Sequence, residues 1–114
     1  MAECIFCRIA SREIAADIIY EDEHCVAFRD VNKQAPVHAL IVPREHLVNL
    51  AEAAAKDRDL LGHLLLTSRK VAEAERVADS GFRVVINSNA EAGQSVDHLH
   101  LHVLGGRVMR WPPG

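Results

Sequence analysis

The stretch His98-Leu99-His100-Leu101-His102-Val103 has a histidine at every second position, with leucine or valine between the histidines. Along a β-strand, successive side chains point to opposite faces of the sheet. The apolar residues should therefore enter a core, and the three imidazoles should share the other face. The pattern predicts a strand over residues 97–104 whose histidine face is a functional site.

Three imidazoles on one strand face have several interpretations. In a surface strand that merely happens to be rich in histidine, neighbouring rings that became charged together would repel each other. A His₃ metal centre of the carbonic anhydrase or cupin kind is a second interpretation. A cupin usually adds a carboxylate soon afterwards, however, and residues 104–114 contain no Asp or Glu. Their composition weakens the metal interpretation.

The third interpretation is nucleophilic catalysis at phosphorus. A neutral imidazole attacks through one ring nitrogen when a fixed acceptor, such as a backbone carbonyl, holds the proton of the other nitrogen. Gly93-Gln94-Ser95 stands directly before the predicted strand. A glycine there lets backbone N–H groups approach an anionic oxygen, and a serine hydroxyl can reach a leaving group. This placement favours catalysis at phosphorus.

The rest of the chain predicts one α+β domain over residues 1–114. A short helix is expected over 3–10 and a long one over about 57–77. The apolar stripe of the long helix consists of Leu61, Leu64, Leu65, Val71 and Ala72. The β-like runs besides the histidine strand are 18–20, 25–28, 37–42 and 82–86. We therefore expect an antiparallel sheet of about five strands, with the long helix covering one face.

Composition excludes several classes of partner. The 114 residues are 49% hydrophobic, which is ordinary for one globular core. Thirteen Lys and Arg against sixteen Asp and Glu give a net charge of -3, without the clustered basic face of a nucleic-acid-binding protein. We find no run of about 18 apolar residues and no signal-peptide pattern at the start, so we expect a cytoplasmic protein without a membrane partner.

The three cysteines divide into a pair and a single residue. Cys4 and Cys7 form a C-x-x-C motif, which in a reducing compartment indicates metal or redox use. A thioredoxin-like redox pair would follow the first strand, whereas this pair precedes every predicted strand. Cys25 lies among apolar residues and is expected to be a small buried side chain.

Together these motifs resemble those of the histidine triad (HIT) superfamily, whose signature is H-φ-H-φ-H-φ with φ apolar. The similarity to the nucleotide-binding HINT branch extends over nearly the whole chain. It is carried by Gln34-Ala35-Pro36-Val37-His38, Asn87, Gly93-Gln94-Ser95-Val96, Leu104-Gly105-Gly106-Arg107 and Trp111-Pro112-Pro113-Gly114.

The resemblance implies hydrolysis of purine nucleoside phosphoramidates to a nucleoside monophosphate and an amine. His100 matches the nucleophile that becomes transiently nucleotidylated, and Ser95 matches the residue that hydrogen-bonds the leaving group. His38 matches the histidine that assists proton movement with His100. The matching phosphate ligands are His102, Asn87 and the backbone of Gly93, Gln94 and Ser95. We expect turnover without any metal, because backbone amides and His102 supply the charge stabilisation.

The resemblance also implies a nucleotide pocket. Asp30 matches the carboxylate that binds the ribose hydroxyls, and Val31 follows it at the base. The apolar walls match Ile5, Phe6, Ile9, Ile14, Phe28 and Leu40. Each position also has a plainer interpretation: Asp30 as a turn residue, Asn87 as a residue that shapes its loop, and the apolar residues as core.

The cysteine pair departs from many HINT sequences. Other branches of the superfamily, especially bacterial ones, carry such a pair and resemble zinc binders. The resemblance then implies a structural Zn²⁺ held by Cys4, Cys7, His46 and His98. A closed Cys₂His₂ shell leaves no open position for water. We expect such an ion to be separate from the reaction centre.

Two other functions remain open: a regulatory nucleotide-binding module with incidental turnover, and a dinucleoside polyphosphate hydrolase of the related Fhit branch. The ending Trp111-Pro112-Pro113-Gly114 favours the HINT branch over the latter. Leu60, Leu64 and Leu66 on the predicted helix are more apolar than one sheet face can cover, and Trp111 lies in a tail without any pattern to bury it. A homodimer is therefore expected.

Overall fold

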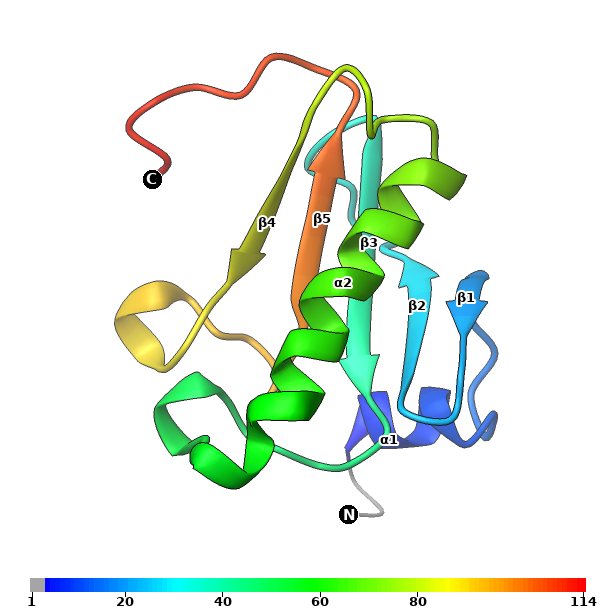
Figure 1. The fold of residues 1–114 in the computed structure, drawn as a ribbon, viewed down its shortest axis with the longest axis vertical. Helices are drawn as coiled ribbons and strands as arrows, with labels where there is room; N and C mark the ends of the chain where they lie inside the picture. Colours follow the sequence, from blue (N-terminus) through cyan, green and yellow to red (C-terminus); the bar gives the residue numbers. More distant parts are fainter. Residues whose placement is uncertain (1–3) are drawn as a thin grey trace.

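One antiparallel sheet of five strands, ordered β1-β2-β3-β5-β4, forms the centre of the computed structural model, which describes residues 4–114 (Figure 1). The strands are β1 (Ile18–Glu21), β2 (Cys25–Arg29), β3 (Val37–Pro43), β4 (Phe82–Ile86) and β5 (Leu101–Gly105). The helices are α1 (Ile5–Ala10) and α2 (Arg58–Ala74), and short 3₁₀ turns are η1 (Leu50–Glu52), η2 (Ala55–Asp57) and η3 (Ala90–Ala92). The predicted α+β fold is confirmed.

The two faces of the sheet are covered by different helices. On one face, alternate residues of β3 and β5 pack with Leu64 and Val71 of α2 in the larger apolar cluster. On the other face, Phe28 and Leu40 pack against Phe6 and Ile9 of α1. His102 lies directly opposite Leu40 in the β3–β5 pairing, so it belongs to the face that α1 covers. The long helix and the histidine face are therefore on opposite sides of the sheet.

The predicted strand over 97–104 begins later than expected. Strand β5 starts at Leu101, and the residues before it leave the ladder. Their partner strand ends at Pro43, which has no N–H to donate, and the N–H of Leu99 donates instead to Leu47 O at 2.6 Å. Alternation of burial survives this break: Leu99 enters the α2 core, while His98 and His100 contact the Phe6 ring on the other side.

The predicted stripe of α2 is wrong at one position. Leu65 is 52% exposed, whereas Leu64 is fully buried. The buried face includes Thr67 and Ser68, whose hydroxyls donate to carbonyls one turn back along the helix. This self-bonding lets two polar residues occupy positions that a hydrophobic pattern assigns to leucine. The sequence analysis also assigned Leu64, with Leu60 and Leu66, to a dimer interface. That assignment is wrong for Leu64, because this side chain packs in the chain's own core.

Cys25 is buried as expected. Its side chain is fully enclosed in the α2 core, and burial raises the pKa of its thiol to about 11. It is therefore a structural thiol that stays protonated. Within residues 4–114, no helix combines the length and apolarity needed to cross a membrane.

Candidate functional site

A cavity of about 570 Å³ opens on the α1 face of the sheet. Its apolar walls contain all six side chains predicted for a base pocket: Ile5, Phe6, Ile9, Ile14, Phe28 and Leu40. Its polar lining includes Asp30, Ser95, His100 and His102. Short helix α1 supplies three of the wall residues, because the spacing of Ile5, Phe6 and Ile9 directs them toward one side of the helix. The cavity thus joins an apolar slot to a cluster of histidines.

His100 presents one free ring nitrogen at this cavity. The residue is buried, and its Nδ1 lies 2.7 Å from the carbonyl oxygen of His98. A carbonyl only accepts, so Nδ1 carries the proton in the neutral ring and the electron pair is on Nε2. The backbone acceptor required for attack by an imidazole is therefore provided two residues upstream.

Hydrogen bonds determine which ring nitrogen carries the proton in His38 and in His102. The N–H of Gln34 donates to His38 Nδ1 at 3.0 Å, so the neutral His38 ring carries its proton on Nε2. That nitrogen donates to His102 Nδ1 at 2.9 Å, which leaves the His102 proton on Nε2. Among the described residues, His102 Nε2 is the only buried side-chain nitrogen or oxygen without a hydrogen-bond partner. A buried unpaired donor is costly, and it marks a place where a ligand would supply the acceptor.

Burial keeps these rings neutral. Burial, together with the neighbouring His100 and His38, lowers the pKa of His102 to about 4. Burial also lowers the pKa of His38, although the nearby Asp30 carboxylate opposes that shift. Both histidines are therefore uncharged at pH 7, and the tautomers above are those of the neutral rings.

Asp30 and Val31 lie at the rim of the cavity. Asp30 Oδ1 accepts from the N–H of Asn32 at 2.9 Å, and its Oδ2 is 3.4 Å from His38 Nε2. The Asp30 carboxylate thus accepts a hydrogen bond within the turn after β2 and also lies beside the His38 ring. The Val31 side chain is fully exposed beside it.

The loop before the histidines is arranged differently from the prediction. The N–H groups of Gly93 and Gln94, predicted to meet phosphate, donate to carbonyls of Ala90 and Asn89 inside the loop. Gly93 has φ of +80°, a conformation that favours glycine. Asn87 follows β4 and does not line the cavity, whereas Ser95 does. Of the predicted contacts Asn87, Gly93, Gln94 and Ser95, only Ser95 lines the cavity.

One buried residue near the loop was missed by the sequence analysis. Asn49 is 1% exposed, and its side-chain amide bonds to Asn89 and to Gln94. The only signal in the sequence is a single amide between Val48 and Leu50, which does not distinguish a buried hydrogen-bonding residue from a loop residue.

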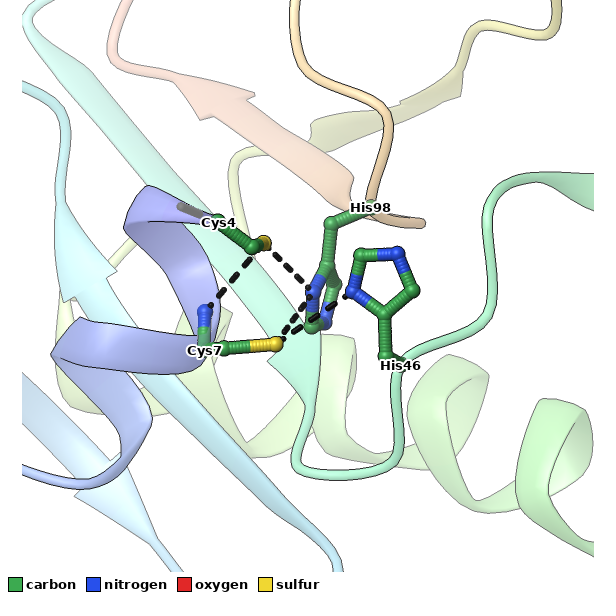
Figure 2. A group of neighbouring side chains, drawn as sticks. All are labelled: Cys4, Cys7, His46 and His98. Carbon is green, nitrogen blue, oxygen red and sulfur yellow. Dashed lines mark hydrogen bonds between the residues drawn. The ribbon is translucent and has the colours of Figure 1, made fainter. Parts of the chain in front are cut away.

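Four ligand-type side chains meet beside the cavity (Figure 2). Cys4 and Cys7 come from the start of α1, His46 from the segment after β3, and His98 from the segment before β5. His98 Nδ1 lies 3.2 Å from Cys4 Sγ and 3.5 Å from Cys7 Sγ, and His46 Nδ1 lies 3.3 Å from Cys7 Sγ. The four residues predicted as metal ligands are therefore brought together.

Their geometry fits a tetrahedral metal ion. Bonds of roughly 2.3 Å to sulfur and 2.0 Å to nitrogen place neighbouring ligands about 3.5 Å apart at the tetrahedral angle. His98 is fully buried, and its Nε2 donates to the carbonyl of Pro43 at 2.8 Å. This bond places the His98 electron pair on Nδ1, facing the sulfurs, which is the tautomer a metal ligand needs. Burial lowers the pKa of His98, so the ring is neutral and available.

Comparison with known proteins identifies the class. A family model of the HIT domain matches residues 11–109. An uncharacterized HIT-like protein of Synechocystis is 56% identical over 115 residues, which cover 100% of both chains. A HIT family hydrolase from Legionella pneumophila is 46% identical, with a TM-score of 0.96 over 98% of this chain and 100% of that one. A histidine triad nucleotide-binding protein from Candida albicans is 28% identical, with a TM-score of 0.81 over 96% and 83% of the two chains.

The chain belongs to the HIT domain family. Its domain and fold are those of a HIT family hydrolase.

Proposed function

We propose that this protein hydrolyses purine nucleoside phosphoramidates through a covalent nucleotidyl intermediate on His100. The observation that carries the proposal is the pairing of two adjacent rings with opposite character. His100 offers an electron pair on Nε2, and His102 offers an unpartnered N–H, with ring centroids 5.1 Å apart. A nucleophile beside a hydrogen-bond donor is the arrangement that attack on an anionic phosphorus centre needs.

The reaction has two steps. His100 Nε2 bonds to phosphorus while the bond from phosphorus to the amine nitrogen breaks, and the departing nitrogen takes up a proton through the Ser95 hydroxyl. Ser95 is exposed, so solvent replaces that proton. Water then attacks the phosphorus, the bond to His100 breaks, and the nucleoside monophosphate leaves with release of one proton. The protons taken up and released are equal.

The cavity supports a purine nucleotide as the substrate. Its apolar slot suits a flat base, and Asp30 lies where the ribose hydroxyls would need an acceptor. His102 Nε2–H would meet an oxygen of the phosphoryl group held against His100. The relative from Candida albicans, described as a nucleotide-binding protein, also supports this choice.

The direct test is a single-turnover experiment. Enzyme in excess is mixed with an adenosine 5′-phosphoramidate, quenched early, and examined by intact mass. The expected result is a gain of one adenosine monophosphoryl group that peptide mapping places on His100. A protein that binds adenosine monophosphate but neither gains this mass nor releases amine would instead be a nucleotide-binding module.

We also propose that Cys4, Cys7, His46 and His98 hold a structural zinc ion. The donor set, the distances of 3.2 to 3.5 Å and the tautomer of His98 support it. Bound there, zinc would supply a cross-link between α1 and the segments before and after the central strands. Since α1 carries three wall residues, the cross-link would hold the base pocket in shape.

Finally, we propose that two copies of the chain associate. Leu65 and Leu66 on α2 are 52% and 68% exposed, and Trp111 in the tail is 81% exposed. A symmetric second copy would remove this apolar surface from water. Light scattering should give the mass of two chains, and Leu66→Glu should shift the mass toward one. A wild type that is monomeric at micromolar concentration would contradict the proposal.

A further inference from the structure

Three amide side chains form a hydrogen-bonded cluster behind the loop that carries Ser95, and Asn49 at its centre is buried. Asn49 precedes η1, while Asn89 and Gln94 flank η3. Asn49 Nδ2 donates to Asn89 Oδ1 at 3.0 Å and to Gln94 Oε1 at 2.9 Å. None of the three residues lines the nucleotide cavity. The cluster therefore acts on the site only through the loop.

Asn49 and Gln94 use both the donor and the acceptor end of their amides. Asn49 Oδ1 accepts from the N–H of Glu52 at 3.1 Å, so both ends of its amide are engaged. Gln94 Nε2 donates to the carbonyls of Val48 and Val96 at 2.8 and 3.0 Å, and Gln94 Oε1 also accepts from the N–H of Asn89 at 2.9 Å. Only a neutral amide offers both two donors and an acceptor, so neither alanine nor a carboxylate can replace these contacts.

These bonds fix the backbone on both sides of Ser95. The Gln94 side chain reaches over Ser95 to the carbonyl of Val96, which closes a small ring around the serine. The bond to Val48 and the contact with Asn49 fasten that ring to the segment between β3 and α2. The Ser95 hydroxyl itself has no hydrogen bond to any other residue within 4–114. Its position therefore depends on the backbone that the amides hold.

We propose that Asn49 and Gln94 are positioning residues that hold the Ser95 hydroxyl against the departing nitrogen. The inference rests on the proposed phosphoramidate hydrolysis. As the bond from His100 Nε2 to phosphorus forms and the bond to nitrogen breaks, the nitrogen must gain a proton through Ser95. A small displacement of that hydroxyl affects this proton transfer and leaves attack by His100 and nucleotide binding largely unchanged.

The test compares two adenosine phosphoramidates that differ only in the amine. A basic alkylamine leaves poorly without a proton, whereas a weakly basic arylamine leaves without much help. Asn49→Ala should lower kcat about 100-fold on the alkylamine substrate and only a few-fold on the arylamine substrate. Ser95→Ala should show the same selectivity, and the double variant should lose little more than either single variant. The Kd for adenosine monophosphate should stay within about 3-fold of wild type.

A milder variant covers the case in which Asn49→Ala folds poorly. Asn89 has φ of +70°, a conformation that glycine adopts without strain. Asn89→Gly therefore preserves the backbone while it removes one hydrogen-bond acceptor from Asn49. It should lower kcat on the alkylamine substrate roughly 5-fold with the same selectivity. Glu91→Gln, an exposed substitution in the same loop, is the matched control and should behave as wild type.

The outcomes separate the two proposals. If wild type cleaves both substrates and Asn49→Ala or Asn89→Gly slows them equally, the cluster has only a structural role and this inference is overturned. Additive losses for Asn49→Ala and Ser95→Ala would overturn it as well. If wild type cleaves neither substrate, the proposed function falls and takes the inference with it.

Discussion

The two ends of the histidine stretch share one residue type and one face of the sheet, yet their environments differ. At one end, both ring nitrogens of His98 are engaged, Nδ1 with the cysteine sulfurs and Nε2 with Pro43 O. At the other end, His100 and His102 each have one ring nitrogen engaged and the other without a partner among residues 4–114. His98 therefore has no ring nitrogen left without a partner, whereas His100 and His102 each have one that a ligand could contact.

This difference shows that hydrogen bonds to backbone groups decide what a histidine can do. The carbonyl of Pro43 takes the Nε2 proton of His98 and turns Nδ1 toward sulfur, while the carbonyl of His98 takes the Nδ1 proton of His100 and frees Nε2. For His102, the same control comes through His38 from the N–H of Gln34. Three equivalent positions in the sequence thus acquire three chemistries.

The largest effect is expected at His100, which has one ring nitrogen without a partner among residues 4–114. His100→Ala removes the only atom proposed to bond phosphorus, so kcat should fall by about 10⁴-fold or more. The Kd for adenosine monophosphate should change only a few-fold, because the pocket walls and His102 remain. Steady-state kinetics measures kcat, and calorimetry measures the Kd for adenosine monophosphate. Undiminished turnover by His100→Ala would contradict the assignment of the nucleophile.

At the proposed zinc site around His98, the expected effect is on stability. Protein purified without an affinity tag or added metal should hold about one equivalent of zinc, and its removal should lower the free energy of unfolding by about 4 kcal/mol when free zinc is near 1,000 times its Kd. Cys4→Ser should lose the metal, while Cys25→Ala, which alters the cysteine outside the cluster, should retain it. Elemental analysis and thermal unfolding provide the measurements. A Cys4→Ser variant with as much zinc as wild type would show that the cysteines do not bind it.

The fold was accessible to sequence reasoning because it depends on periodicity. The β-like runs 37–42 and 82–86, the alternation of residues 98–103 and the helical stripe around Leu64 and Val71 are local patterns that the core enforces. The misplaced strand start at residue 97 and the misassigned Leu65 depend instead on hydrogen bonds made at a distance or along the helix. The pairing of Leu99 N–H with Leu47 O leaves no trace in a hydrophobic pattern.

The site divides in the same way. The motif brought out His100, His102, Ser95 and the four cysteine and histidine residues, because each carries recognisable chemistry. It could not show that the backbone N–H of Gln34 sets a tautomer, since every residue except proline has that group. Gln94 has a side chain suited to a ligand contact, and only the three-dimensional structure shows that its amide is used against Asn49 and Val48.

An intermediate effect should appear in the pH dependence of stability. The folded-state pKa of His102 is about 4, below the unfolded value of about 6.5, so between these values the unfolded chain binds more protons. The contribution of neutral His102 is therefore complete above pH 6.5 and is lost as pH falls toward 4, by up to about 3 kcal/mol. Urea unfolding of wild type and His102→Gln between pH 7 and 4.5 should show a shallower slope in the variant. Equal slopes would mean that His102 is not buried in the neutral form.

The smallest effect is expected for His38, which contacts His102 but does not line the cavity. It donates to His102 Nδ1 at 2.9 Å and so keeps the His102 proton on Nε2. In His38→Ala, His102 can adopt either tautomer, and we expect kcat to fall about 10-fold because the competent form is only partly populated. His24→Ala, a histidine outside this cavity, is the control and should match wild type. Nitrogen NMR of His102 reports the tautomer directly. A loss as large as that of His100→Ala would instead give His38 a direct part in the chemistry, and an unchanged tautomer would remove its orienting role.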